Sequence, residues 1–316
     1  MTRNSVEVAA VRDVVNRGTL VEGAPILSSS SAAEGPARSS AARGSRRRPL
    51  RVIRRMVLVL VMFALGIVMF YPYLFMIDAS FRTQPQFEKG SGRSLESWSK
   101  LFTAVPIWQE LANSTIVALG ALVIIIAVSS AAGFAFAKLG YRGSTVMLLG
   151  IVAAMMIPLQ SIIIPEYVNL ANLGLLTDRF GAILVYAAIG IPFATFLMTT
   201  YYRGIPDEIL EAAVIDGLSY RGLFLRLGLP LAMPAIVTVI VLQFVQIWGD
   251  LLVGLLFLQN SDQRTITVGL GVLSSGRTTD IPVLMAGALV SALPAVAVYL
   301  VFQRFLIRGL TAGIGK

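Results

Sequence analysis

The polar loop at residues 202–230 contains residue types that could form a docking surface for another protein. The residues that could form it are Glu208, Glu211, Ala212, Ala213, Asp216 and Gly217. Glu208 and Glu211 are three residues apart, so on a helix they share one face and can pair with basic groups of a partner. The alanines are small, so a partner surface can approach the backbone closely. This pattern predicts binding through charge and close contact.

The rest of the sequence excludes most catalytic chemistry. It contains no cysteine and no histidine, so it offers no disulfide, thiol nucleophile, thiolate zinc site or imidazole base. The phosphate-binding pattern G-x-x-x-x-G-K-[ST] is also missing. We therefore expect no enzyme activity, metal or cofactor in this chain. Any use of nucleotide energy would need a separate subunit.

The pattern of the loop predicts two short helices joined by a tight bend. Pro206 suits the first position of a helix, where its missing N–H does no harm. Asp207 and Glu208 follow in the first turn, where negative charge is favourable. Gly217 can adopt the left-handed conformation that ends a helix, and Ser219 is a good N-cap for the next one. A helix lying on the membrane surface is the alternative to a docking helix.

Long apolar runs surround this loop. Of the 316 residues, 56% are hydrophobic and 14% are charged. A helix needs about 20 apolar residues to cross a bilayer, and helices satisfy their own backbone hydrogen bonds there. We predict an all-α membrane protein with six transmembrane helices, at residues 56–77, 113–137, 146–168, 181–201, 232–258 and 283–303.

Basic residues predict the orientation. They cluster before the first span, at Arg46–Arg48, and follow later spans at Lys138, Arg203 and Arg304. The positive-inside rule places both termini and loop 202–230 in the cytoplasm, in a multi-pass protein of the cell (inner or plasma) membrane. The net charge of +9 fits membrane anchoring, and no nucleic-acid partner is expected because no basic stripe alternates with exposed aromatics.

The first 49 residues differ from the rest. Residues 1–49 are rich in serine, alanine, arginine and glycine and lack apolar periodicity, so we predict a disordered cytoplasmic tail. Residues 50–316 are predicted to form one six-helix domain in the lipid bilayer.

The run from Ile205 to Gly217, followed by Leu229-Pro230 and Pro234-Ala235, resembles the EAA motif of ABC importer permeases. Its Asp-Gly form is most similar to carbohydrate permeases of the maltose-importer type. The resemblance extends over about residues 54–316 and includes Asn113-Ser114. One departure is Gly249, which follows Trp248 where the family commonly has asparagine.

The resemblance implies a division of labour among subunits. The EAA helix would seat in a groove on a separate cytoplasmic ATPase subunit, where ATP is bound. A second, non-identical permease subunit would complete the pathway, and an extracytoplasmic solute-binding protein would deliver a sugar or oligosaccharide. Arg304, Arg308 and Thr311 could touch the ATPase at the C-terminus, while membrane anchoring is the alternative for the two arginines.

Polar residues of the fifth predicted span could line a substrate path: Gln243, Gln246, Trp248 and Asp250. Sugar sites combine aromatic faces with hydrogen-bonding groups, and polar groups in a span face the bundle interior or a water-filled path. Ordinary hydrogen bonding between helices is the alternative.

An ion-coupled secondary transporter of small solutes is the alternative function. Such proteins usually place an ionisable group near the membrane midplane and repeat one half of the chain in the other. The sequence has no convincingly central ionisable group and no such repeat.

Overall fold

The computed structural model describes residues 47–312 except 177, 277 and 278, with side chains from residue 54 to 305. Within these residues the chain is helical and has no strand. The chain divides into two compact units, and the boundary between them, after Phe63, falls within helix α2 (Arg47–Ser80). Residues 1–46 of the predicted tail lie outside the described residues, so its predicted disorder stays a prediction.

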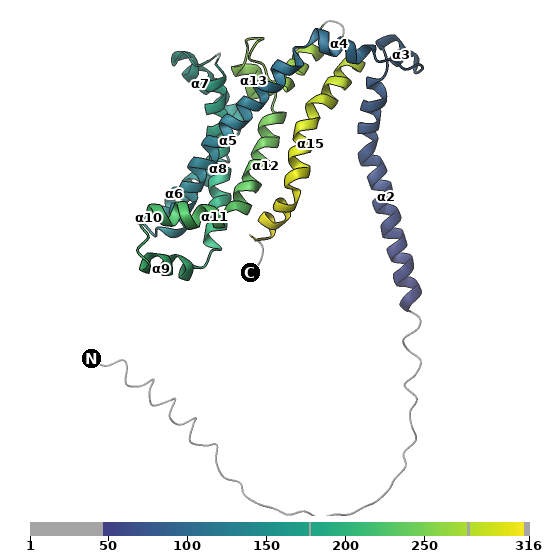
Figure 1. The fold of residues 1–316 in the computed structure, drawn as a ribbon. Helices are drawn as coiled ribbons and strands as arrows, with labels where there is room; N and C mark the ends of the chain where they lie inside the picture. Colours follow the sequence, from purple (N-terminus) through teal and green to yellow (C-terminus); the bar gives the residue numbers. More distant parts are fainter. Residues whose placement is uncertain (1–46, 177, 277–278, 313–316) are drawn as a thin grey trace, which may run out of the picture. The chain divides into compact units, whose positions relative to one another are not determined.

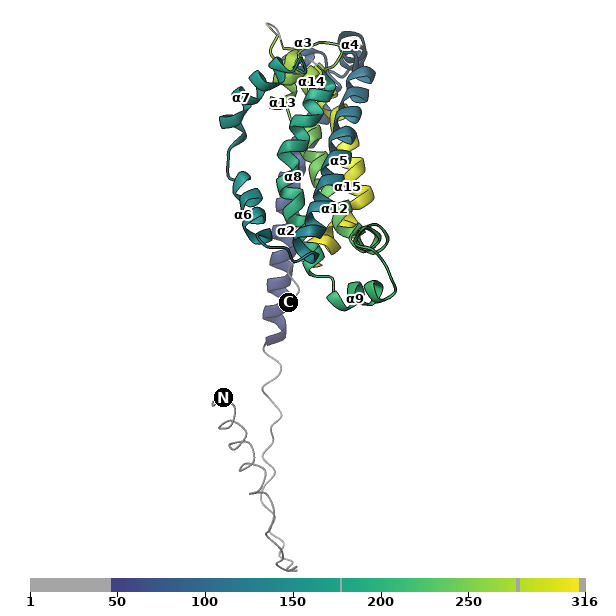
Figure 2. The ribbon, with the colours of Figure 1, turned by 90° about the vertical axis from the view of Figure 1, so that its left-hand side faces the viewer.

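The described helices confirm an all-α membrane protein. Four of them are long and apolar enough to cross a membrane: α2, α5 (Ile107–Lys138), α8 (Arg179–Arg203) and α15 (Ile281–Ala312). The count rises to six if each of two bent helix pairs is one span. In the part from Ala64 onward, α5, α8, α15 and α12 (Met233–Gly249) lie side by side (Figures 1 and 2).

The predicted third span, 146–168, is wrong as a continuous helix. It consists of α6 (Ser144–Ala154) and α7 (Leu159–Asn172), which meet at 94° (Figure 2). Pro158 has extended backbone angles and caps the start of α7. A proline has no N–H to donate and disfavours helical geometry in the residue before it, so it breaks the run.

The predicted fifth span, 232–258, is also wrong as a single helix. Helix α12 ends at Gly249, Asp250 is extended, and the short helix α13 (Leu252–Phe257) follows. Helix α14 (Ile266–Ser274) then precedes α15. The break matters for function because it lies among the residues predicted to line a substrate path.

Glycine contacts bring α5 and α8 close together. A Cβ added to Gly133 of α5 would lie 2.7 Å from Met198 Cβ of α8, and one added to Gly190 of α8 would lie 2.6 Å from Ile125 Cδ1 of α5. Small residues allow membrane helices to approach at backbone distance. The contacts run in the same order along both helices, so α5 and α8 pack as a parallel pair, and the end of α5 lies beside the end of α8.

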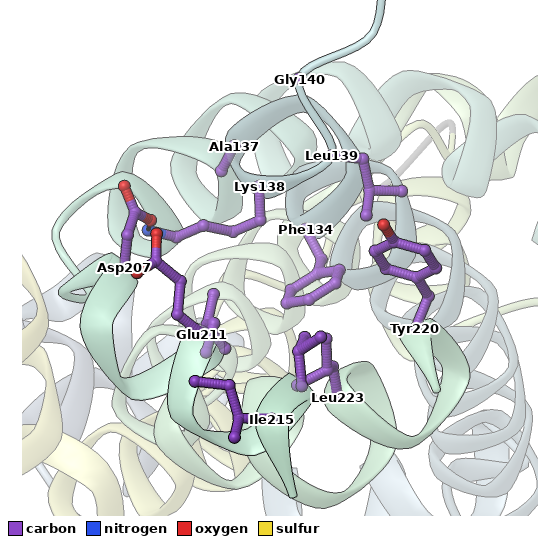
Figure 3. A pocket seen from close by; sticks show the side chains of 12 residues that line it. Phe134, Ala137, Lys138, Leu139, Gly140, Asp207, Glu211, Ile215, Tyr220 and Leu223 are labelled. Atoms are coloured by element: carbon purple, nitrogen blue, oxygen red, sulfur yellow. Dashed lines mark hydrogen bonds and ion pairs between the residues drawn. The ribbon is translucent and has the colours of Figure 1, made fainter. Parts of the chain in front are cut away.

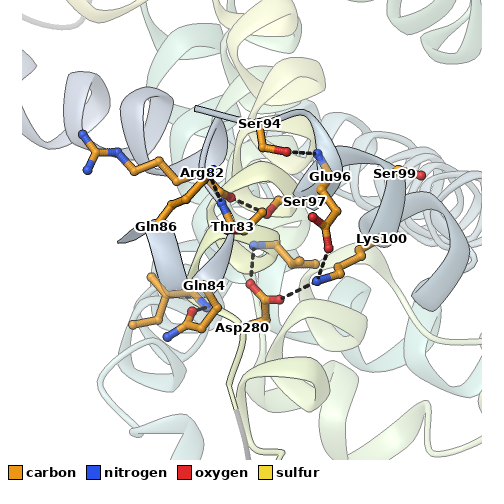
Figure 4. A network of polar contacts seen from close by, with 12 residues as sticks. Arg82, Thr83, Gln84, Gln86, Ser94, Glu96, Ser97, Ser99, Lys100 and Asp280 are labelled. Atoms are coloured by element: carbon orange, nitrogen blue, oxygen red, sulfur yellow. Dashed lines mark hydrogen bonds and ion pairs between the residues drawn. The ribbon is translucent and has the colours of Figure 1, made fainter. Parts of the chain in front are cut away.

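A polar network connects three elements at the end of the bundle away from the last turns of α5 and α8 (Figures 1 and 4). Its elements are α3 (Gln84–Lys89), α4 (Glu96–Ala104) and the start of α15. Lys100 Nζ lies 2.8 Å from Glu96 Oε1 and 3.9 Å from Asp280 Oδ2, and Gln84 Oε1 accepts a hydrogen bond from Ile281 N at 3.0 Å. The hydrogen bond to Glu96 raises the pKa of the Lys100 ammonium above its usual value.

Candidate functional site

Helix α9 (Asp207–Ile215) forms the first half of the predicted docking loop, and it lies at one end of the bundle (Figures 1 and 2). Pro206 occupies the N-cap position, with φ −57° and ψ 136°, so the helix begins at Asp207 and the prediction of Pro206 as its first residue is wrong by one position. Asp207 and Glu208 lie in the first turn, where the positive end of the helix dipole stabilises their negative charge.

The bend after α9 confirms the left-handed conformation predicted for Gly217. Its φ is 86°, in the left-handed region. The Leu218 N–H donates to the Ala213 carbonyl at 3.0 Å, and the Gly217 N–H donates to the Val214 carbonyl at 2.9 Å. These two hydrogen bonds are the paired closure that satisfies the last carbonyls of a helix and reverses the chain.

A short helical segment follows and returns the chain to the bundle. Ser219 caps α10 (Tyr220–Gly222), as predicted, by accepting a hydrogen bond from Gly222 N at 3.3 Å. The chain continues through the π-helical segment η1 (Leu223–Gly228) and α11 (Leu229–Leu231). This segment meets α12 at 68°.

A groove of about 610 Å³ separates α9 from the end of α5 (Figure 3). Most of its lining is apolar or aromatic, with charged groups from α5 and α9. The lining residues that matter below are Phe134, Lys138, Asp207, Glu211, Ile215 and Tyr220. The groove therefore combines apolar surface with a carboxylate that could meet a basic group.

One lysine links α5 to the start of α9. Lys138 Nζ donates to the Ile205 carbonyl at 2.6 Å and lies 2.6 Å from Asp207 Oδ1 (Figure 3). The Lys138 side chain is 5% exposed, whereas the Asp207 side chain is 74% exposed. A buried ammonium needs such partners, because leaving it unpaired would cost free energy.

The residues predicted for docking do not all face outward. Glu208, Glu211, Ala212 and Asp216 are exposed. Ala213 is buried, together with Leu210, against the rest of the chain. The small size of Ala213 therefore lets α9 approach its own bundle, and only Ala212 leaves the backbone open to a partner.

Two groups of residues at this site were not singled out from the sequence. Phe134 packs edge-on to Tyr202 with ring centroids 5.4 Å apart and lies 5.5 Å from the Phe224 ring, which joins α5, α8 and η1. Lys138 was considered only as an inner-flank charge. The sequence signal for this contact was a lysine at the end of one span and an aspartate at the start of the loop helix. Whether the two meet depends on how α5 and α8 pack.

Three of the four residues predicted to line a substrate path make contacts within the chain, and their place on such a path stays a prediction. Gln243 is buried against Gly190. Trp248 is buried, and its Nε1 donates to the Ser291 carbonyl at 2.9 Å, which ties α12 to α15. Asp250 accepts hydrogen bonds from Tyr186 OH at 3.0 Å and from Val253 N at 2.8 Å. Gln246 is the one of the four that is exposed.

The C-terminal residues are described only in part. Arg304 is exposed, with its guanidinium 4.9 Å from the Phe305 ring centroid. The side chains of Arg308 and Thr311 lie outside the described residues, so their predicted contact with an ATPase stays a prediction. Among the described residues, no group of three or more acidic side chains could hold a metal ion.

Comparison with known proteins identifies the family. Residues 126–311 match the family described as "Binding-protein-dependent transport system inner membrane component". The osmoprotective compounds uptake permease protein GgtD of Synechocystis is 36% identical over 205 residues, covering 65% of this chain and 69% of that protein. The arabinooligosaccharides transport system permease protein AraQ of Halalkalibacterium halodurans is 29% identical over 252 residues, covering 77% of this chain and 90% of that protein.

A solved structure has the same fold. It is the crystal structure of a bacterial ABC transporter involved in the import of the acidic polysaccharide alginate, with a TM-score of 0.71 and 21% identity over 84% of this chain and 99% of that chain. The family match, over residues 126–311, includes α9, all of α8 and the C-terminal part of α5. The chain therefore belongs to the binding-protein-dependent transport system inner membrane component family, and it is a multi-pass permease subunit of an ABC importer and not an enzyme.

Proposed function

We propose that this permease imports a sugar or oligosaccharide and that α9 seats on a separate cytoplasmic ATPase subunit. The observation that carries the proposal is the outward acidic face of α9. Glu208 and Glu211 are exposed, while Leu210 and Ala213 face the bundle. A helix held by its apolar side leaves its polar side free to bind another protein.

The surface next to Glu211 suits a protein partner better than water. Ile215 is 86% exposed, and Val214 is also exposed. Both line the groove together with Glu211. Apolar area provides binding free energy, and a carboxylate beside it selects a basic partner group. We therefore place the ATPase contact on Glu208, Glu211, Ala212 and Asp216, with Gly217 fixing the bend.

The proposed mechanism is alternating access driven from the ATPase. Two ATPase subunits that close on ATP would move the seated α9 helices. That movement would change the relative stability of inward-open and outward-open arrangements of the bundle, because contacts differ between the two states. A second, non-identical permease subunit would supply the other half of the path. The termini and α9 would face the cytoplasm.

Carbohydrate as the substrate class rests on likeness to other transporters. The AraQ relative is named for arabinooligosaccharides, and the transporter with the same fold is named for alginate. A solute-binding protein outside the membrane would deliver the sugar. Within the predicted path residues, exposed Gln246 is the candidate for a hydrogen bond to a sugar hydroxyl.

Reconstituted transport tests this proposal. The permease is purified with its copurifying subunits, reconstituted into liposomes, and supplied with its binding protein and radiolabelled oligosaccharides. We expect uptake only when ATP is present on the ATPase side, and no effect of an ionophore that collapses proton and sodium gradients. ATP-independent uptake that the ionophore stops would refute the proposal.

A further inference from the structure

Lys138 holds the junction between α8 and α9 from outside that junction. Its ammonium contacts the Ile205 carbonyl and the Asp207 carboxylate, both at 2.6 Å, and so it binds the residues on either side of Pro206. We call these two contacts the Lys138 bridge. The lysine itself comes from the last turn of α5, so the bridge links two spans and the loop helix.

The bridge lies where the backbone hydrogen bonds of α8 end: Gly204 N and Ile205 N donate to the Tyr201 and Tyr202 carbonyls at 3.0 and 3.1 Å. Only Gly204, Ile205 and Pro206 separate the end of α8 from the start of α9. Pro206 has no N–H, so it cannot donate a backbone hydrogen bond across the junction. At the other end of α9, by contrast, the two hydrogen bonds around Gly217 close the chain.

The α5–α8 pair gives the bridge a firm base. Gly133 lies five residues before Lys138, and a Cβ added to it would lie 3.0 Å from Thr199 N. The Phe134 ring packs against Tyr202. Closely packed helices move as a unit, because packed interfaces resist continuous deformation. A displacement of α9 would therefore reach both spans together while the bridge is intact.

We propose that Lys138 is a positioning residue that fixes α9 relative to α5 and transmits the movement of α9 to the α5–α8 pair. This inference rests on the proposed function of α9 as the ATPase contact. Lys138 itself is nearly buried and need not touch the ATPase. Its chemistry makes the role specific, since one ammonium offers three donors and can satisfy a carbonyl and a carboxylate together.

The two partners of the bridge predict an order of effects. Lys138→Met keeps the apolar stem and removes both contacts. Asp207→Ala removes the exposed carboxylate and leaves the hydrogen bond to Ile205. Lys138→Arg keeps a charged donor that can reach both oxygens. We therefore expect Lys138→Met to disturb the position of α9 most, Asp207→Ala less and Lys138→Arg least.

Distance measurement by electron spin resonance tests the positioning directly. The chain has no cysteine, so cysteines that carry spin labels can be introduced at chosen sites without removing native ones. One pair joins Val123 of α5 to Ile215 of α9, which are 68% and 86% exposed, and about 22 Å of helix axis separates Val123 from Lys138. We expect one narrow distance distribution in the full-length chain and in Lys138→Arg, and a broader or shifted one in Lys138→Met.

A second label pair separates positioning from general unfolding. Ile116 of α5 and Phe196 of α8 are exposed and report on the α5–α8 packing. We expect this distance to stay unchanged in Lys138→Met. If the packing itself changes, Asp207→Ala must still broaden the Val123–Ile215 distances. Unchanged Val123–Ile215 distances in both variants would overturn the inference.

The transport stoichiometry tests the transmission. In the reconstituted complex we expect Lys138→Met to lower the solute moved per ATP hydrolysed about 5-fold or more, within the usual range of coupling free energies. Arg203→Met is the matched control, because Arg203 is exposed at the end of α8 and forms no ion pair among the described residues. An unchanged ratio in Lys138→Met would contradict the inference. A wild-type complex without ATP-dependent uptake would instead refute the proposed function and leave the distance result standing.

Discussion

Substitution of Gly217 isolates the backbone conformation that ends α9. Gly217 has a φ of 86°, and a Cβ added there would meet no atom within 4 Å. The cost of Gly217→Ala is therefore conformational and not steric, at about 1–2 kcal/mol for an L residue in the left-handed region. If the strained bend opens, the fraction of chains with a correctly placed α9 falls, and the apparent Kd for the ATPase rises by at most about 5- to 30-fold.

The side-chain series makes this reasoning testable. Asparagine tolerates the left-handed region, so Gly217→Asn should bind the ATPase nearly as well as wild type. Gly217→Val should bind more weakly than Gly217→Ala, because a β-branched side chain is least compatible with positive φ. Titration of the detergent-solubilised permease with labelled ATPase subunits measures each Kd.

A matched control places the same strain elsewhere. Gly90 has a φ of 69° and open space around an added Cβ, and it lies at the end of α3, away from α9. Gly90→Ala should leave the Kd for the ATPase unchanged. The reasoning fails if Gly217→Asn binds as weakly as Gly217→Val, or if Gly90→Ala weakens binding as much as Gly217→Ala does.

Three further substitutions test other parts of the account. Glu211→Lys reverses the charge on the docking face, so uptake should be lost while membrane extraction and blotting show a normal amount of protein; uptake at the wild-type rate would argue against docking through this face. Gly133→Ala should lower the free energy of unfolding by about 1–3 kcal/mol relative to Gly150→Ala, because an added Cβ has no room at Gly133 and open space at Gly150, as thermal denaturation in detergent will show. Gln246→Ala should raise the KM for uptake about 2- to 10-fold, the worth of one hydrogen bond, whereas Trp248→Phe should lower stability and leave KM unchanged; the reverse pattern would place the substrate contact at Trp248.

The sequence predicted the loop accurately because its signals are local. Gly217 and Ser219 act through their own backbone angles and nearby N–H groups, so residue type and spacing were enough to place them. The family resemblance added the role of the loop. The start of α9 was wrong by one residue, since Pro206 can either cap a helix or begin it.

The two interrupted spans show where hydropathy alone fails. An apolar run records which residues avoid water, but it does not record whether the backbone continues straight. Pro158 and Asp250 interrupt the third and fifth predicted spans within apolar sequence. Prolines in other spans are tolerated, as Pro192 is inside α8, so a proline by itself could not distinguish a break from a continuous helix.

Contacts between segments far apart in the chain could not be predicted from the sequence. Lys138 and Asp207 are 69 residues apart, and nothing in either segment shows that the ends of α5 and α8 meet. The buried partners of Trp248 and Asp250 are likewise set by packing against α15 and α8. Residue type therefore suggested a substrate path, but it could not show that Trp248 and Asp250 form hydrogen bonds within the chain.

The polar network of α3, α4 and the start of α15 should respond to pH only in alkaline solution. The pKa of Lys100 is raised above 10.5, so the stabilisation it gives is complete below that pH and is lost as pH rises through the raised value. Changes of pH within the neutral range should therefore leave the contacts of Lys100 intact. Hydrogen exchange of the Ile281 amide at pH 7 and pH 8, corrected for the intrinsic rate, should show the same protection.

Site-directed crosslinking from α9 tests the central claim most directly. A single cysteine at Ala212, on the exposed face of α9, carries a photoactivatable crosslinker in a chain with no other cysteine. In the assembled transporter we expect the crosslinked product to contain the ATPase subunit and its yield to change when ATP binds. A product that contains only lipid, with and without ATP, would contradict the account.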